Sequence, residues 1–421
     1  MLIPTVISTL VVTSGSAAAA PEVEPHLAVH LRPEVRTNPA FVAGQDDTVV
    51  AVQQGVRVGV SGSWDSVSAR VDVQEVRTWG ERLGSTGTEP AVHAYQGHIE
   101  VDTGSGYVRI GRQEIHLHKG YFLSRAPFNP AGRSFDGLRW HQAAGSMATD
   151  LFLTQLAASQ GWVDGDAPSD LGDWFGGGQV TWKDSDAFRP SVFVFAKAGG
   201  ATAAEPARTD RWFGPGARAT LRMDETLLEL DGLVQIGDDS GTPRRAYNVI
   251  ARAEQGFGMA LDPGVAVRFD QSSGHACSGP AGGAACVGDV ESAIDLQFGR
   301  NFYLRGFANQ MSAANTRQMA VEGFVRPSET TRVELIGSWF QMTDPEGAWI
   351  GPGGTLQGAG WKPGNADPNL GWELDGRVIW KASKALQLAG GLAWFQPVGV
   401  GAELTGTDAQ SYTWLQTRFT L

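Results

Sequence analysis

The chain has 421 residues and a formal net charge of −12 at pH 7, and this acidic balance argues against a nucleic-acid-binding protein. Its mean hydropathy of −0.17 requires no helical membrane span, and its length suits one large barrel or two ordinary domains. Only 6 of the 33 basic residues are Lys. An excess of Arg is typical of carboxylate recognition, and it is also typical of a GC-rich genome.

Residues 1–20 predict a secretory signal peptide. The apolar stretch from Ile3 to Val12 is too short to span a membrane, and the small residues Ala17 to Ala20 suit a cleavage site. The basic segment that usually opens such a peptide is missing. We therefore expect residues 21–421 to form the mature chain, as a single domain, in an oxidising compartment.

The chain beyond residue 21 shows almost no helical periodicity, and apolar residues alternate with polar ones in many segments. This period of two predicts strands that are apolar on one face and polar on the other. The apolar positions include Leu27, Val29, Leu31, Val56, Val58, Val60, Ala69, Val71, Val73, Gly97, Ile99, Val101, Leu374, Gly376, Val378, Leu386, Leu388 and Leu392.

The connections between these strands fall into two length classes. Short turns are expected at residues 62–65, 103–106, 184–187, 223–226, 300–301, 327–330 and 382–384. Long loops are expected at residues 37–48, 113–134, 157–173, 199–212, 271–289, 343–369 and 397–409. Short turns at one end and long loops at the other are typical of an outer-membrane barrel, and a soluble sandwich needs no such pattern.

Aromatic residues near strand ends resemble the two girdles of an outer-membrane barrel. They are Trp64, Trp79, Trp140, Trp182, Trp339, Trp380 and Trp394. The alternating segments number roughly eighteen to twenty, and a barrel of that width leaves a lumen unless a plug or loops fill it. The sequence therefore predicts an all-β, antiparallel transmembrane barrel with short periplasmic turns and long extracellular loops, and its long loops are the candidates for a constriction.

The stretch from Tyr107 to Trp140 predicts a hairpin with a long basic loop, in which Pro127 and Pro130 exclude a helix. Five charged residues bracket this loop and are candidates for an anion-selective constriction. They are Arg109, Arg112, Arg133, Asp136 and Arg139. Rings of Arg admit carboxylates, and a nearby Asp prevents Arg from holding them too tightly. The alternative is a set of salt bridges that only braces the wall.

Five further arginines fall on polar strand faces and are expected to line the lumen. They are Arg32, Arg57, Arg70, Arg332 and Arg377.

Two Cys occur, Cys277 and Cys286, and their short Gly- and Ala-rich spacing in a secreted chain predicts a disulfide.

His116 and His118 would share a strand face at a spacing that can bind a metal, but no carboxylate or Cys completes a ligand set, so no metal is expected. There is no nucleophile elbow, H-E-x-x-H motif or phosphate loop, and we expect neither an enzyme nor a cofactor.

Three stretches carry a resemblance to a known family. They are GRQEIHLHKG with RSFDGLRW (residues 111–120 and 133–140), DVQEVRTWG (72–80) and WELDGRVIWKASKALQLAGGLAWFQPV (372–398). In these the chain resembles the alginate export family of outer-membrane barrels, in register over most of its mature length. The resemblance implies a monomeric barrel of eighteen strands, and we expect a number between sixteen and twenty. It also implies an Arg-lined lumen, constricted by loops, for an anionic polysaccharide.

We therefore expect an outer-membrane channel of a Gram-negative bacterium that passes an anionic solute or polysaccharide. Its expected contacts are this solute and outer-membrane lipid. A general or substrate-specific uptake porin is the first alternative, and an outer-membrane enzyme or adhesin is the second. An Arg-dominated constriction favours export, whereas balanced charge favours a general porin.

Overall fold

The computed structural model describes residues 22–39, 47–82, 85–155, 174–199, 209–274, 290, 292–296, 298–300, 302–352, 356–362 and 364–421. The predicted signal peptide and the predicted Cys277–Cys286 disulfide lie outside these residues. The strands are β1 (Glu22–Thr37), β2 (Thr48–Trp64), β3 (Val67–Arg82), β4 (Ser85–Asp102), β5 (Gly106–Gln113), β6 (Phe135–Ala144), β7 (Met147–Gln155), β8 (Trp174–Trp182), β9 (Phe188–Gly199), β10 (Asp210–Met223), β11 (Thr226–Asp239), β12 (Thr242–Gly256), β13 (Gly264–Ser272), β14 (Thr316–Ser328), β15 (Thr331–Met342), β16 (Asn369–Lys381), β17 (Leu386–Pro397) and β18 (Gln410–Thr420).

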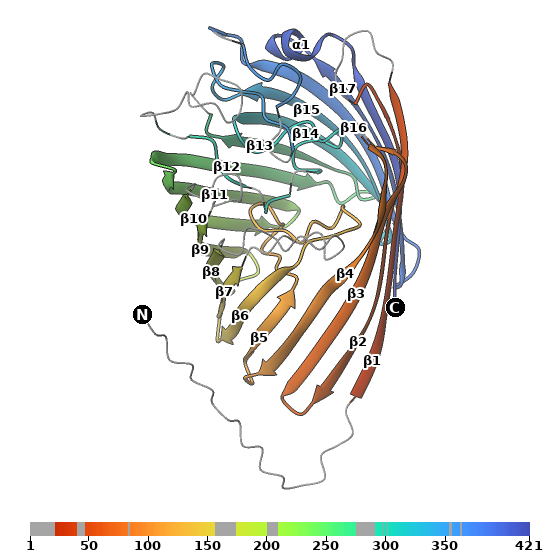
Figure 1. The fold of residues 1–421 in the computed structure, drawn as a ribbon, viewed down its shortest axis with the longest axis vertical. Coiled ribbons are helices and arrows are strands. Elements are labelled where there is room, and N and C mark those ends of the chain that lie inside the picture. The colour runs from red at the N-terminus through yellow and green to blue at the C-terminus, as the bar shows by residue number, and fades with distance from the viewer. Residues whose placement is uncertain are drawn as a thin grey trace.

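The eighteen strands form one closed antiparallel barrel (Figure 1). Each strand pairs with the next in the chain, and β1 pairs with β18 through registers such as Val29 with Phe419. The predicted fold class and the number of eighteen strands are confirmed. Closure leaves no strand edge unpaired, which is what allows a sheet to stand in hydrocarbon.

Side chains alternate across the wall as the sequence pattern predicts. The outer face carries apolar residues such as Val58, Ile110 and Leu335, which are 53%, 62% and 58% exposed. The inner face carries polar residues such as Gln74 and Asp231, both of which are fully buried. An apolar exterior around a polar interior is the arrangement of a membrane barrel, whose outer face meets lipid.

The connections confirm the predicted asymmetry. Those that follow even-numbered strands are short, whereas most that follow odd-numbered strands are long, with residues 83–84 and 240–241 as short exceptions. The expected short turn at residues 300–301 is wrong. Arg300 lies between β13 and β14, in a chain segment that enters the barrel instead of forming a wall hairpin.

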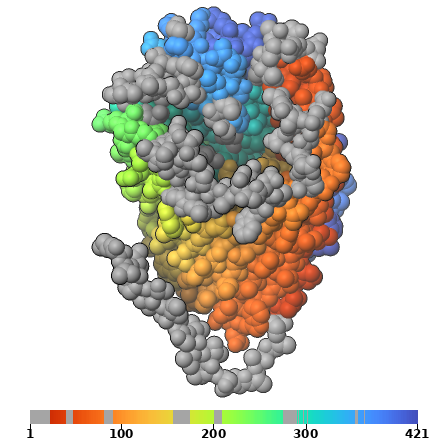
Figure 2. All heavy atoms as spheres, viewed as in Figure 1, coloured from red at the N-terminus to blue at the C-terminus, as the bar shows by residue number. Residues whose placement is uncertain are grey.

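The long connections build a cap over β14–β18 at one end of the barrel. The helix α1 (Val400–Thr405) belongs to this cap, and its residues Val400 and Leu404 pack in a buried cluster with Trp349 and Phe340. Figure 2 shows this C-terminal part above the wall of N-terminal strands, with the surface hollowed between them. No helix in the described part of the chain is long and apolar enough to cross a membrane.

The alternation yields a test of membrane insertion. Leu335 faces outward on β15, so the substitution Leu335→Arg should place a charge in hydrocarbon and lower the free energy of unfolding by about 2–4 kcal/mol if the site is near the midplane. Urea unfolding in lipid vesicles measures this change, with Leu335→Ala as the uncharged control. Equal stability of the two variants would contradict a lipid-facing position.

Candidate functional site, a constriction formed by two inward segments

Two connections fold into the barrel and meet inside it. The first inward segment is Glu114–Ser134, between β5 and β6, and the second comprises the described residues of the range 290–315, between β13 and β14. The Ser124 amide donates to the Phe298 carbonyl at 2.8 Å, and the Arg300 amide donates to the Gly120 carbonyl at 2.9 Å. In Figure 1 the first segment lies within the ring of strands. The predicted role of long loops in narrowing the lumen therefore has a structural counterpart.

Apolar packing holds the first inward segment in place. Its buried residues Ile115, Phe122 and Leu123 join a cluster with Phe193 and Phe195, which point inward from β9. Burying a side chain of this size contributes about 1.5–3 kcal/mol. The segment is thus fixed against the inner wall formed by β7–β11.

The second inward segment is held by polar contacts with the wall. Asp295 accepts hydrogen bonds from Lys197 at 2.9 Å and from Trp212 at 3.1 Å, and Arg305 pairs with Asp270 at 2.8 Å. Phe302 stacks on Phe128 of the first segment. The two segments therefore form one constricting unit.

An arginine cluster lies where the first inward segment meets β1, β2 and β18. Arg32 and Arg418 donate to the carbonyls of Phe128 and Pro127, and Arg57 donates to the Pro130 carbonyl at 3.3 Å.

Two arginines of the inward segments complete the cluster. Arg125 shares the Glu114 carboxylate with Arg57, and Arg300 donates to the carbonyl of Phe302, whose ring stacks on Phe128. These five guanidinium groups are called the arginine cluster below.

Two carboxylates accompany the cluster. Glu34 pairs with Arg32 at 3.0 Å, and Glu114 pairs with Arg125 at 3.1 Å and with Arg57 at 3.8 Å. The Arg125 side chain is 53% exposed and is the most accessible member. The cluster thus combines an excess of positive charge with a water-exposed guanidinium.

The predicted Arg109 and Arg139 lie on the inner face, directly opposite each other in the register of β5 and β6. Each is paired with a carboxylate: Arg109 with Glu100 at 2.8 Å and Arg139 with Asp150 at 2.7 Å. They line the lumen but do not belong to the arginine cluster.

Arg112 and Asp136 lie on the opposite face of the wall. They pair with each other, and the alternation of β5 and β6 places them with the exposed Ile110 and Leu138. The structure therefore puts these two predicted site residues on the outer face. Side chains alternate along a strand, and the even-numbered residues of β5 and β6 point outward.

Arg133 lies between the two inward segments and donates to the carbonyls of Ser124 and Phe298 at 3.2 and 2.6 Å. Burial lowers its pKa to about 10, so it stays charged at neutral pH. It acts as a tie between the segments.

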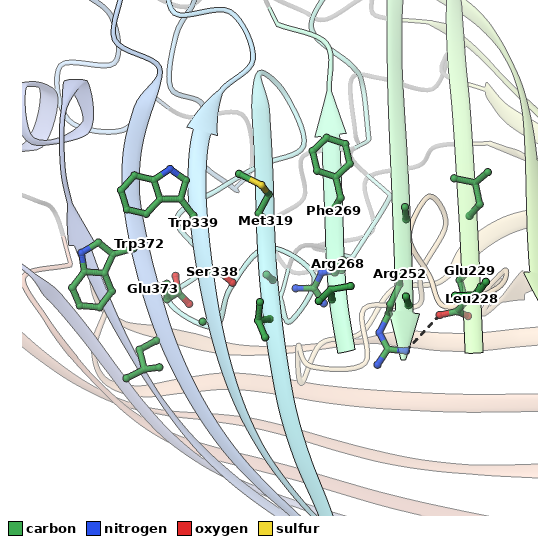
Figure 3. Close-up of a pocket in the computed structure, with 18 residues that line it drawn as sticks. Leu228, Glu229, Arg252, Arg268, Phe269, Met319, Ser338, Trp339, Trp372 and Glu373 are labelled. Carbon is green, nitrogen blue, oxygen red and sulfur yellow. Dashed lines mark ion pairs between the residues drawn. The ribbon is translucent and has the colours of Figure 1, made fainter. Parts of the chain in front are cut away.

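The remaining predicted arginines face inward in salt bridges. Arg70 pairs with Asp72 at 2.8 Å and Arg332 with Glu322 at 2.7 Å, while Arg377 pairs with Glu334. Figure 3 shows the same alternation across β11–β16, where Glu229 and Arg252 form an ion pair. Most of the wall is therefore charge-balanced.

His116 and His118 lie in the first inward segment. Burial lowers the pKa of both, to about 4 for His118, so both are neutral at pH 7. Among the residues that the structure describes, no three His, Cys, Asp or Glu groups could hold a metal ion.

Three cluster members were missed by sequence reasoning: Arg125, Arg300 and Arg418. Arg418 could have been found, because it lies on the polar face of the last strand. Arg125 and Arg300 carry no periodic signal, since they lie in irregular segments.

The fold and this lumen define an outer-membrane β-barrel channel. The family model described as alginate export matches residues 26–409, and the chain belongs to that family. No curated protein matches the sequence.

Solved structures from Pseudomonas aeruginosa share the fold. The outer membrane protein OpdK is 10% identical, with a TM-score of 0.60 over 95% of this chain and 98% of that chain. OprD is 11% identical, with a TM-score of 0.57 over 95% of this chain and 93% of that chain. The shared architecture and the family place the protein in the outer membrane of a Gram-negative bacterium.

The position of Arg133 leads to a prediction. The substitution Arg133→Met removes two hydrogen bonds between the inward segments, each with a net contribution of about 0.5–1.5 kcal/mol. We expect larger and noisier single-channel currents in planar bilayers. Arg189→Met, at the exposed end of β9, is the control, and currents identical to those of the unmodified channel would contradict the tying role.

Proposed function

We propose that this channel passes a carboxylated solute or anionic polysaccharide, and that the arginine cluster selects it. The observation that carries the proposal is the imbalance at the constriction, where five guanidinium groups accompany two carboxylates. Guanidinium groups match the planar geometry of carboxylates. Charges of one sign in a narrow, partly desolvated passage attract counter-ions more strongly than charges on an open surface do.

The surroundings of the cluster suit passage and not permanent capture. Glu34 and Glu114 compete for Arg32, Arg57 and Arg125, and the carbonyls of the first inward segment occupy further donors. Conduction requires binding strong enough for entry and weak enough for release. A passing carboxylate would exchange with these acceptors at little net cost.

A second candidate is uptake of a small carboxylated solute. The salt bridges of Arg109, Arg139 and Arg332 balance the charge along most of the wall, and balanced charge is what a less selective porin requires. One structural neighbour, OpdK, has been solved with vanillate, an aromatic carboxylate. Both candidates use the same constriction and differ in the size of the solute.

Anion selectivity can be tested on the cluster itself. In the double variant Arg57→Gln/Arg418→Gln two charges are lost, each attracting an anion by about 1 kcal/mol in water-like surroundings. We expect the ratio of anion to cation permeability to fall about fivefold or more. The reversal potential of bilayers under a KCl gradient reports this ratio.

The outer-face residue Arg112 provides the matched control. Arg112→Gln removes the same charge outside the lumen and should leave the reversal potential unchanged. An equal shift in both variants, or no shift in the cluster variant, would refute selection by the cluster. A further variant tests the paired wall residues. Arg109→Ala/Arg139→Ala should also shift permeation away from anions. An unchanged reversal potential in this double variant would mean that these two arginines only brace the wall.

A further inference from the structure

Glu373 and Asp375 form an unusual pair on the inner face of β16. Each is 1% exposed, and no Lys or Arg of the described chain lies within salt-bridge distance of either. Other buried wall acids, such as Glu334 and Asp150, are paired with arginine. Two unpaired carboxyl groups in one buried place need another means of stabilisation.

A tight turn of the second inward segment, at Gly306–Ala308, packs against this pair. The Ala308 amide donates to Glu373 Oε1 at 2.9 Å. Gly306 has a φ of 85°, and a Cβ there would lie 2.5 Å from the Glu373 oxygens. The turn therefore fits the carboxyl groups closely enough to require glycine.

Glu373 and Asp375 lie two residues apart on the buried face of β16, and Glu373 Oε2 and Asp375 Oδ1 have no hydrogen-bond donor in the described structure. A carboxylate only accepts hydrogen bonds, so the two groups can bond to each other only when one of them carries a proton to donate. Full ionisation would leave two adjacent negative charges buried without a cation in contact, an arrangement that proteins avoid by keeping a proton.

The other charged groups near the turn are engaged elsewhere. Arg36, from β1, donates to the Ala308 carbonyl at 2.9 Å, and Arg268, from β13, donates to the Tyr303 carbonyl at 3.3 Å. Arg377, next on β16, pairs with Glu334, and Arg305 pairs with Asp270. Tyr303 donates to Glu322 at 3.2 Å. In the described structure none of these cations pairs with Glu373 or Asp375, so a bound proton is what keeps the two carboxyl groups from both being charged.

We propose that Glu373 and Asp375 form a proton-operated latch for the second inward segment. With the proton bound, the pair holds the turn at Gly306–Ala308 against the wall. When the proton is lost, repulsion between the carboxylates releases the turn and widens the constriction. The proposal concerns how wide the channel is and not which ions it prefers, so it stands or falls separately from anion selection.

The latch makes the channel width depend on pH. The closed form holds one proton more than the open form, so it is favoured at low pH and lost as the pH rises. For one proton the ratio of closed to open channels falls by up to about tenfold per pH unit through the transition.

Single-channel conductance between pH 4 and 9 tests the latch in the unmodified protein. We expect conductance to rise with pH in a single one-proton step. A conductance that stays constant across this range would overturn the proposal, whatever the ion selectivity is.

The variant Asp375→Asn separates the pair from other titrating groups. Its amide can still donate to Glu373 but carries no titratable proton, so conductance should remain at the low-pH value throughout. Asp231→Asn, a buried inward acid on β11 away from the turn, is the control and should keep the pH step. A pH step that persists in Asp375→Asn would overturn the proposal.

Accessibility of the turn gives a second measurement. Ala308 is fully buried, and Ala308→Cys, in a chain with Cys277→Ser and Cys286→Ser, can be labelled by a maleimide only when the turn opens. The labelling rate at pH 8 relative to pH 5.5 should be higher than in the same protein with Asp375→Asn, which corrects for thiol reactivity. Equal ratios would contradict release of the turn.

Discussion

The width of the closed barrel is the constraint on which the rest of the structure depends. Eighteen antiparallel strands enclose more space than the wall side chains can fill, and the chain fills part of it with its own connections. The first inward segment is fixed because Ile115, Phe122 and Leu123 bury apolar surface against Phe193 and Phe195. This contact sets the position of its carbonyls, and through them the position of Arg32, Arg57 and Arg418.

The inner wall is governed by a second requirement, the pairing of charges that leave bulk water. Arg109, Arg139, Arg332 and Arg377 satisfy it with carboxylates from neighbouring positions. Pairing offsets the cost of taking these charges out of bulk water and reduces the field that they exert on the lumen. Selectivity therefore has to arise where pairing is incomplete, and that condition is met at the arginine cluster.

The strand period made the barrel predictable from sequence. Val58, Val60 and Ile110 alternate with polar neighbours, and this pattern survives because one face of the wall meets lipid and the other meets the lumen. The same rule, followed past residue 110, assigns Arg112 and Asp136 to the outer face. They were grouped with the lumen residues because they are close in sequence to the loop, and not because of their phase.

The inward segments were harder to predict, because irregular chain carries no period. Residues near Arg300 were assigned to a wall turn, whereas their apolar neighbours Phe302 and Phe307 pack inside the barrel. One available signal was the run from Val192 to Phe195, which is apolar at both alternating phases and is typical of a strand buried on both faces. Such a run indicates that another part of the chain covers the inner face of β9 at these residues.

The most direct test of the account is the block of channel current by oligosaccharides matched in length, one carboxylated and one neutral, added to the unmodified channel in a planar bilayer. A lumen whose excess of positive charge lies at the arginine cluster should be blocked by the carboxylated oligosaccharide at lower concentration, and added salt should weaken this block. Equal block by the neutral oligosaccharide, with no dependence on salt, would contradict the claim that incomplete charge pairing at the constriction selects the solute.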